Sequence, residues 1–525
     1  MKAIRHSILT ICLLLASWPA AKPQDTAGRD ILALDLPGAL ITVNESVPEN
    51  MFVVPGGGQK PVELPAFRRI ALIAKPVPTS NIGIEIWLPE KDWNGRFLGT
   101  GNGGGAGAIN YGALASGLRR GFAVANTDMG TSPNANEVIG YPERWKDFGY
   151  RATHEMTVIA KAAIEACYKQ APRYSYFIGC STGGQQAIME AQRFPEDYDG
   201  IIAGAPANNR THLHALFLWN HQAANACDCR FTPEQLTQIT DEIIRSNAGK
   251  DGGLPTDDFL TDPRAATLDY SKLELFLKKE QIEALKKVFN GPVNPATGER
   301  IYTPFPLGSE NQGLGLGYMQ DAAVTNDQFY LFRWIWGRDF PFSKFDFNQD
   351  IMKTDSILAP LLNANNPNLE PFKRKGGKLL MYTGTADPIV PFQDAIQYYE
   401  RVVEQQGGLK ETQSFFRYFL VPGMAHCGGG PGVNDFGQGL PEHSQDKEHD
   451  IMTALIRWVE QGEAPEKMIA TGYKENRTIR FERPVFPYPQ FPAYTGGDPA
   501  AASSYQAIAR ERGVATSSAP AYLKE

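Results

Sequence analysis

Hydrophobic residues in the first part of the chain recur with two different spacings. Short apolar runs rich in Ile, Val, Leu and Phe predict strands at 69–74, 82–88, 96–98, 122–125 and 174–178. Apolar residues at helical spacing predict helices at 154–168 and 184–193. Strands that alternate with helices are typical of βαβ units, so the pattern predicts a parallel sheet between residues 65 and 205.

The pattern changes at about residue 210 and returns at about 370. The middle segment is irregular and rich in Asp, Asn, Pro and Gly, with helical stretches at 233–245 and 273–288 and an aromatic run at 329–336. It carries too many apolar residues to stay disordered, which predicts an inserted domain. Strands are predicted again at 378–383 and 415–421, followed by a helix at 451–461. The tail after Pro484, rich in proline and alanine, is expected to pack loosely on the surface.

We therefore expect an α/β domain formed by 65–209 and 371–525, an insertion at 210–370, and a segment at 22–64 that packs on the core. Residues 1–21 combine a basic start, an apolar stretch too short to span a bilayer and small residues at the end. This is typical of a secretory signal peptide and predicts a secreted or periplasmic protein, although a buried N-terminal helix has the same pattern. No later apolar run approaches ~18 residues, so no membrane association is expected once the signal is removed.

The charge and the cysteine content of the chain limit the partners and the metal sites that can be expected. The 525-residue chain has a formal net charge of -7 and no arginine-rich run, which argues against nucleic acid as a partner. Loss of Cys12 with the signal would leave five cysteines, an odd number. The pairing of Cys167, Cys227 and Cys229 stays open, and no histidine or cysteine pair has the spacing of a zinc site.

The sequence Gly-Cys-Ser-Thr-Gly at 179–183 lies between a predicted strand and a predicted helix. In that context the glycines allow a sharp turn that exposes the serine hydroxyl at the carboxyl end of the sheet, so Ser181 is the candidate nucleophile. Asp387 and His426 each come after a predicted strand and are the candidate acid and base. For Asp387 alone, a turn before proline is the alternative. The order Ser, Asp, His is that of α/β-hydrolases.

A serine nucleophile also needs backbone N–H groups that hold the oxyanion. Thr182 supplies one, and Gly103 or Gly104 in the glycine-rich loop at 99–105 is expected to supply the second. A glycine-rich loop can also bind phosphate, but this one has no P-loop lysine. Cys180 and Cys427, next to the candidate nucleophile and base, come within disulfide distance if Ser181 and His426 touch. The alternative is that Cys180 only fills a small buried space.

These motifs resemble those of the tannase and feruloyl esterase family of secreted serine esterases, which includes hydrolases of terephthalate monoesters. The resemblance rests on Gly-Cys-Ser-Thr-Gly-Gly-Gln-Gln at 179–186, Gly-Thr-Ala-Asp-Pro-Ile-Val-Pro at 384–391 and Pro-Gly-Met-Ala-His-Cys-Gly-Gly at 422–429. It implies an α/β-hydrolase core, a lid inserted between nucleophile and acid, and a disulfide between Cys180 and Cys427.

The resemblance also raises the question of a structural calcium ion in the lid. Family members often hold one in an acidic loop framed by cysteines, and the nearest stretch here, at 251–263, is longer and lacks those cysteines. Its candidate ligands are Asp251, Asp257, Phe259 and Asp262, because carboxylates and carbonyls suit a hard cation. A solvated acidic turn is the alternative. Another departure is Phe486, which stands where the family's tail usually has cysteine. No cofactor is expected to be required for catalysis.

The lid is expected to define the substrate. Aromatic walls suit a planar acyl group and an arginine could pair with a carboxylate, which makes candidates of Phe217, Trp219, Phe332, Arg333, Trp334 and Trp336. The alternative for each is a place in the lid's own core. His154, His212, His214 and His221 are expected to be structural. The predicted function is hydrolysis of small esters of aromatic, hydroxylated acids, free or attached to plant polysaccharide, by a serine esterase. Feruloyl esterase, tannase and terephthalate-monoester hydrolase are not separated by the sequence, and a non-catalytic binding module is the remaining alternative.

Overall fold

The structure is a computed structural model of the 525-residue chain. It describes residues 38–513 apart from 59, 106, 133, 227–228 and 443–445. The predicted signal peptide at 1–21 and the first part of the segment 22–64 lie outside the described residues. Within the described ranges, no helix is long and apolar enough to cross a membrane.

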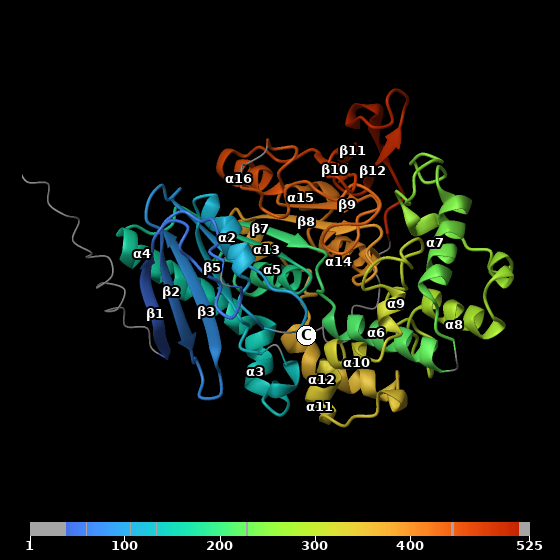
Figure 1. Cartoon of the computed structure of the whole chain (residues 1–525), viewed down its shortest axis with the longest axis horizontal. Helices are drawn as coiled ribbons and strands as arrows, with labels where there is room; N and C mark the ends of the chain where they lie inside the picture. Colours follow the sequence, from blue (N-terminus) through green and yellow to red (C-terminus); the bar gives the residue numbers. More distant parts are fainter. Residues whose placement is uncertain are drawn as a thin grey trace, which may run out of the picture.

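A nine-stranded sheet forms the centre of the molecule (Figure 1), with the strand order β1-β2-β3-β5-β4-β6-β7-β8-β9. Neighbouring strands from β5 to β9 run parallel, whereas β1, β2, β3 and β5 pair antiparallel at the other edge. The strands are β1 (Ala39–Val47), β2 (Phe67–Ala74), β3 (Ile82–Pro89), β4 (Arg96–Thr100), β5 (Ala123–Thr127), β6 (Tyr174–Cys180), β7 (Gly200–Gly204), β8 (Lys378–Gly384) and β9 (Phe416–Val421). This arrangement is an α/β-hydrolase core, as predicted.

Helices cover both faces of the sheet because the parallel strands are apolar on both sides. On β6, Tyr176 and Phe177 point to opposite faces and belong to two separate apolar clusters. The Tyr176 cluster includes side chains of α2 (Tyr111–Arg119) and α16 (Ile451–Gln461). The Phe177 cluster includes side chains of α4 (Ala152–Tyr168), α5 (Thr182–Arg193) and α14 (Phe392–Gln405). The shorter helices α3 (Pro142–Lys146) and α15 (Leu409–Gln413) complete the core domain.

The chain leaves the sheet after β7 and returns at β8, and the helices between them form the lid (green to yellow in Figure 1). Two apolar clusters hold the lid together, one around Phe217 and Phe332 and one around Ile239 and Leu285. Its helices are α6 (Arg210–Asn225), α7 (Pro233–Asn247), α8 (Lys279–Asn290), α9 (Leu316–Met319), α10 (Val324–Asp327), α11 (Tyr330–Trp336) and α12 (Gln349–Leu362). The last helix before β8, α13 (Glu370–Arg374), is the exception, because its Phe372 packs in the core cluster of Phe177.

One lid helix differs from the prediction. The stretch predicted as helix at 273–288 is divided into a 3-10 turn, Tyr270–Leu275, and helix α8, which begins at Lys279. The side chain of Gln281 accepts a hydrogen bond of 3.0 Å from the backbone N–H of Lys278. This bond satisfies an N–H group at the helix start that has no partner within the helix, so it stabilises the start of α8 at Lys279.

Two other segments are more regular than the sequence indicated. Residues 39–47, predicted only as part of a segment packed on the core, form the edge strand β1 and pair with β2. The described part of the tail after Pro484, predicted to pack loosely, carries the hairpin β12–β13, and a further hairpin, β10–β11, precedes it. Buried Tyr488 ties the tail to the core with a hydrogen bond of 2.8 Å to Glu400. The hairpin strands are β10 (Met468–Tyr473), β11 (Ile479–Val485), β12 (Gln490–Tyr494) and β13 (Tyr505–Ala509).

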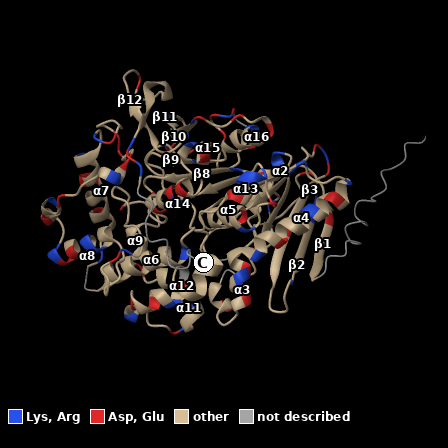
Figure 2. Cartoon of the chain, turned by 180° about the vertical axis from the view of Figure 1, so that it is seen from behind, with Lys and Arg blue, Asp and Glu red and all other residues tan. Residues whose placement is uncertain are grey.

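Charges of both signs are interspersed over the molecule. In Figure 2, Lys and Arg alternate with Asp and Glu along the helices in view.

Candidate active site

Ser181 lies on a sharp turn between β6 and α5. Its backbone has φ 64° and ψ -117°, a conformation that non-glycine residues rarely adopt. The turn is tight because a Cβ on Gly179 would lie 2.5 Å from the backbone of Gly183. Only glycine fits at such a close approach, so the two glycines of the motif allow the turn that presents Ser181 at the carboxyl end of the sheet.

His426 and Asp387 are held together beside this turn. His426 Nδ1 lies 2.8 Å from Asp387 Oδ2. Asp387 is fully buried, and its Oδ1 accepts hydrogen bonds from the backbone N–H groups of Ile389 and Val390 at 2.8 and 2.9 Å. An ionised carboxylate only accepts hydrogen bonds, so Nδ1 carries the hydrogen and Nε2 of the neutral ring is left as an acceptor. Nε2 is therefore the imidazole atom that can take a proton.

A disulfide joins the residues next to Ser181 and His426. Cys180 and Cys427 are bonded, with their Cα atoms 5.9 Å apart and a separation of 247 positions in the sequence. The predicted bridge is therefore confirmed. It connects the end of β6 to the loop after β9 and holds the histidine loop against the serine turn.

These residues line one cavity of about 370 Å³. This volume is in the range of small-molecule sites. Ser181, His426, Cys180 and Cys427 form one side, and the predicted oxyanion residues Gly103, Gly104 and Thr182 line the same space. The lid contributes Arg210, Leu213, His214 and Phe217 from α6, Leu314 from the loop before α9, and Gln328, whereas Ile389 and Val390 come from the core loop between β8 and α14.

Arg210 organises this site and was not singled out from the sequence. It is 3% exposed and donates hydrogen bonds of 2.9 Å to the hydroxyl of Thr182 and of 2.9 Å to the carbonyl of Gly104. It also donates to Gln185 at 3.2 Å and to the hydroxyl of Tyr330 in the lid. One guanidinium group thus connects the serine turn, the glycine loop and the lid. Its position at the start of α6, a few residues after β7, is the signal in the sequence, because functional side chains of such sheets follow the carboxyl ends of strands.

His214 also lines the cavity, although the sequence predicted a structural role. It is 1% exposed, and burial lowers its pKa well below the usual value, so the ring is neutral at pH 7. Its Nδ1 has no hydrogen-bond partner among the described residues. Together with Phe217 one turn further along α6, it gives the cavity an aromatic wall with a neutral polar atom.

Most of the aromatic residues predicted to line the substrate pocket lie elsewhere in the lid. Phe217 lines the cavity, but Trp219, Phe332, Arg333, Trp334 and Trp336 do not. Trp334 stacks on Trp145 and donates to the carbonyl of Ala135 at 2.9 Å. Trp219 packs on Phe347 and donates to the carbonyl of Lys287 at 2.8 Å, while Phe332, Arg333 and Trp336 pack in the lid around Phe342 and Phe345. The alternative interpretation, a place in the lid's own core, fits Trp219, Phe332, Arg333 and Trp336, whereas Trp334 packs against the core domain and joins the cluster of Phe177.

The acidic loop predicted to bind calcium has its carboxylates occupied by protein donors. Asp251 accepts from the backbone N–H groups of Thr261 and Asp262 at 2.5 and 3.2 Å, and both oxygens of Asp262 accept from Arg264. Asp257 pairs with Arg483 at 3.3 Å, and Phe259 stacks on Phe481. Guanidinium groups supply the positive charge that a calcium ion would bring, so the residues as arranged do not fit the ion.

Another group of metal-ligating atoms lies behind α5. His154, Glu190 and Asp197 offer ligand atoms within 4.8 Å of one another. His154 Nδ1 is 2.7 Å from Asp197, and the ammonium of Lys161 bonds to the carbonyl of the same residue. Burial raises the pKa of Glu190 well above its usual value, which favours a neutral carboxyl group there. A metal ion binds the ionised carboxylate, so a neutral Glu190 does not fit a ligand role here.

Among the other cysteines, Cys229 is disulfide-bonded, and Cys227 lies outside the described residues.

Comparison with known proteins gives a consistent set of relatives. Residues 70–508 match the family described as tannase and feruloyl esterase. An uncharacterised esterase of Xanthomonas campestris pv. campestris is 33% identical over 99% of this chain and 97% of that protein. Feruloyl esterase B of Aspergillus niger is 31% identical over 82% of this chain and 84% of its own length. The crystal structure of feruloyl esterase B from Aspergillus oryzae is 27% identical, with a TM-score of 0.83 over 92% of this chain and 100% of that chain.

Proposed function

The chain belongs to the tannase and feruloyl esterase family and is a carboxylic ester hydrolase, and we propose that it cleaves esters of aromatic, hydroxylated acids through an acyl-enzyme on Ser181. The observation that carries the proposal is the bond of 2.8 Å between His426 and Asp387 in the cavity that Ser181 lines. A serine at the end of a strand, a histidine with its acceptor nitrogen available and a buried carboxylate are the parts of a hydrolytic triad.

In the proposed mechanism, His426 Nε2 removes the proton from Ser181 as its Oγ attacks the ester carbonyl. Asp387 holds the ring in the required tautomer and stabilises the imidazolium that forms. The backbone N–H groups of Thr182 and of Gly103 or Gly104 bind the oxyanion of the tetrahedral intermediate. His426 then gives its proton to the leaving alcohol, and a water molecule activated by the same nitrogen releases the acid.

The lining of the cavity favours a phenolic acyl group over one with a second carboxylate. Phe217, Leu213 and Val390 provide apolar surface for a planar ring. The neutral ring of His214 can exchange a hydrogen bond with a phenolic hydroxyl group. Arg210 is the one guanidinium in the described lining. Its two terminal nitrogens donate to Thr182, Gly104, Gln185 and Tyr330, which leaves only the buried Nε without a partner. A terephthalate monoester would need a cation for its second carboxylate, and a single N–H group cannot bind it in the two-point manner of a free guanidinium, which ranks this ester below hydroxycinnamate and gallate esters.

We also propose that the protein acts outside the cytoplasm, on small esters free or attached to plant polysaccharide. The signal-like pattern at 1–21 and the disulfides at Cys180–Cys427 and Cys229 support this location, because such bonds persist in oxidising compartments. Relatives named feruloyl esterase support the substrate class.

The test is hydrolysis of methyl ferulate, methyl gallate and a terephthalate monoester by the wild type and by Ser181→Ala. We expect methyl ferulate or methyl gallate to be the preferred substrate, and kcat to fall by at least about 10⁴-fold in the variant. Ser356→Ala, an exposed serine on α12, is the matched control and should leave kcat unchanged. Equal activity of Ser181→Ala and wild type would refute the mechanism, and no activity on any of the three esters would favour the non-catalytic binding module.

A further inference from the structure

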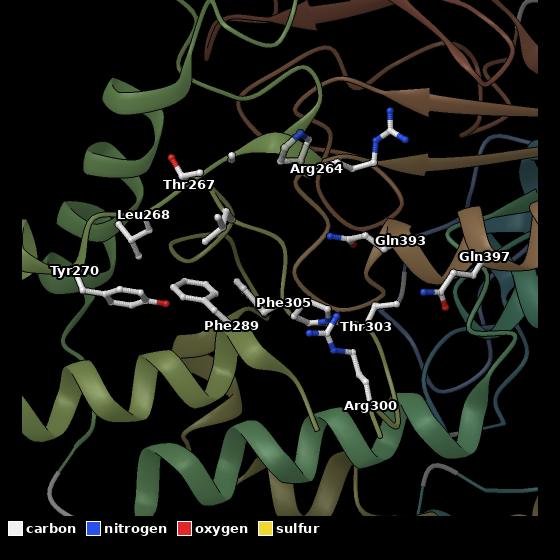
Figure 3. Close-up of a pocket in the computed structure, with 14 residues that line it drawn as sticks. Arg264, Thr267, Leu268, Tyr270, Phe289, Arg300, Thr303, Phe305, Gln393 and Gln397 are labelled. Atoms are coloured by element: carbon white, nitrogen blue, oxygen red, sulfur yellow. The ribbon is translucent and has the colours of Figure 1, made fainter. Parts of the chain in front are cut away.

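A second cavity of about 440 Å³ lies where the lid meets the core (Figure 3). Its walls come from the lid segment 263–307 and from Gln393 and Gln397 on α14, and it shares no lining residue with the cavity around Ser181. Neither the proposed mechanism nor the sequence motifs give this space a role. Its volume matches that of a site for a small organic molecule.

Two buried polar atoms in its wall have no hydrogen-bond partner among the described residues. They are Thr303 Oγ1, on a residue that is 3% exposed, and Gln393 Oε1. In Figure 3 both side chains border the same space, Gln393 from α14 and Thr303 from the lid. A buried polar atom without a partner destabilises the fold, so each needs a hydrogen-bonding group that a molecule in the cavity can supply.

The cavity also has an unpaired cation and aromatic walls. Arg300 is exposed and forms no side-chain hydrogen bond or ion pair with the described residues, whereas neighbouring Arg264 is fully engaged with Asp262. Phe289 and Phe305 lie with ring centroids 6.5 Å apart and rings inclined at 47°, and Tyr270 lines the same space. The space thus combines a guanidinium group, apolar rings and two unsatisfied hydroxyl or amide oxygens.

We infer that this seam between lid and core is a second binding site, for a hydroxylated aromatic carboxylate. The carboxylate pairs with Arg300, the ring packs against Phe289 and Phe305, and a hydroxyl group donates a hydrogen bond to Gln393 Oε1. Thr303 Oγ1 bonds to a second oxygen of the ligand. A simple anion such as phosphate leaves the aromatic walls uncovered, and a neutral sugar leaves Arg300 without its counter-charge. The inference goes beyond the proposed function, because it concerns a separate cavity and binding without turnover.

The test is calorimetric titration of the whole chain with 4-hydroxycinnamate, after Ser181 has been blocked by an organophosphate and the adduct confirmed by intact mass. We expect one remaining site, with Kd weakened at least about tenfold in Arg300→Ala and less in Arg300→Lys, since the bond to a charged group is lost in the first and partly kept in the second. Thr303→Val should also weaken binding. Arg338→Ala, an exposed arginine elsewhere in the lid, is the matched control and should bind as wild type does.

The outcomes separate this inference from the proposed function. If no adduct forms on Ser181, the mechanism fails, and the titration is done on unblocked protein, where Arg300→Ala should remove one of two sites. No binding beyond the catalytic cavity, or binding that Arg300→Ala and Thr303→Val leave unchanged, would overturn the inference. Galacturonate is titrated in parallel, and tighter binding of this acidic sugar than of 4-hydroxycinnamate would overturn the aromatic part of the assignment. Melting temperatures of the variants verify that each is folded.

Discussion

The disulfide between Cys180 and Cys427 should matter for both stability and catalysis, and the two effects can be measured separately. In the double variant Cys180→Ala/Cys427→Ala, the unfolded chain regains the freedom of a loop of 247 residues. The chain-entropy relation gives about 5 kcal/mol for a loop of this length. This is comparable to the whole stability of many domains, so the urea midpoint should fall steeply.

The effect on catalysis follows from what else holds the base. His426 keeps its bond of 2.8 Å to Asp387 in the double variant, so the tautomer is retained. The position of the loop relative to Ser181 is no longer fixed, and a displacement of about 1 Å at a reacting group costs about 10²-fold. We therefore expect kcat/KM to fall by about 10- to 100-fold under conditions in which circular dichroism shows the variant to be folded, with KM little changed.

The assay is initial-rate hydrolysis of methyl ferulate at several temperatures below the unfolding transition, alongside urea denaturation. Cys167→Ala, on α4 and away from the cavity, controls for the loss of a cysteine that leaves the bridge intact. Unchanged kcat/KM in the folded double variant would show that the bridge only stabilises. If activity falls only in proportion to the unfolded fraction, the bridge does not position His426 relative to Ser181.

Three further predictions concern residues around the site and in the lid. Arg210→Met should lower kcat/KM by about 10²-fold and Arg210→Lys by less, measured on methyl ferulate, because the serine turn and the oxyanion loop lose their common donor; equal rates would contradict this. Burial raises the pKa of Glu310 from 4.5 to about 7, so the wild type should lose stability as pH rises from 4.5 to 7. Glu310→Gln should then be more stable than the wild type by up to about 3 kcal/mol above pH 7 and equally stable below pH 4.5, as urea denaturation at both pH values would show. The same difference in free energy of unfolding at both pH values would contradict this. A chelator should leave the melting temperature unchanged and metal analysis should find no stoichiometric calcium, since Arg264 and Arg483 occupy the acidic loop; a rise in melting temperature on adding calcium would reverse this conclusion.

Most of the parallel core was predictable because its signals are local: five of its six strands are the short apolar runs seen in the sequence, and the glycines around Ser181 restrict the backbone directly. Strand β7 was not predicted, since its apolar run is only three residues long between two glycines. The bridge was predicted from the places of its cysteines beside the candidate nucleophile and base and from the family resemblance. The edge strand β1 and the hairpins β10–β11 and β12–β13 were missed, because their regularity comes from pairing with distant partners and their own patterns are weak.

The pocket lining was the least predictable part of the site. Trp334 and Phe217 are both aromatic lid residues, and only the packing of helices decides which one faces Ser181. Arg210 was missed because its role depends on four acceptors from three separate segments, namely the carbonyl of Gly104, the side chains of Thr182 and Gln185, and the hydroxyl of Tyr330. The calcium prediction followed the acidic residues alone, and the arginines that neutralise them come from outside the loop or from its far end.

The position of the lid between β7 and β8 has a consequence for how this architecture can change. Gly204 pairs directly with Tyr382, so the two strands meet regardless of what the chain does between them. The entropy of closing such an excursion grows only with the logarithm of its length, and doubling the length costs about 0.6 kcal/mol. A lid of different size or composition can therefore replace this one at little cost to the sheet. The acyl pocket can then diverge while the serine, the carboxylate and the bridged histidine stay in place.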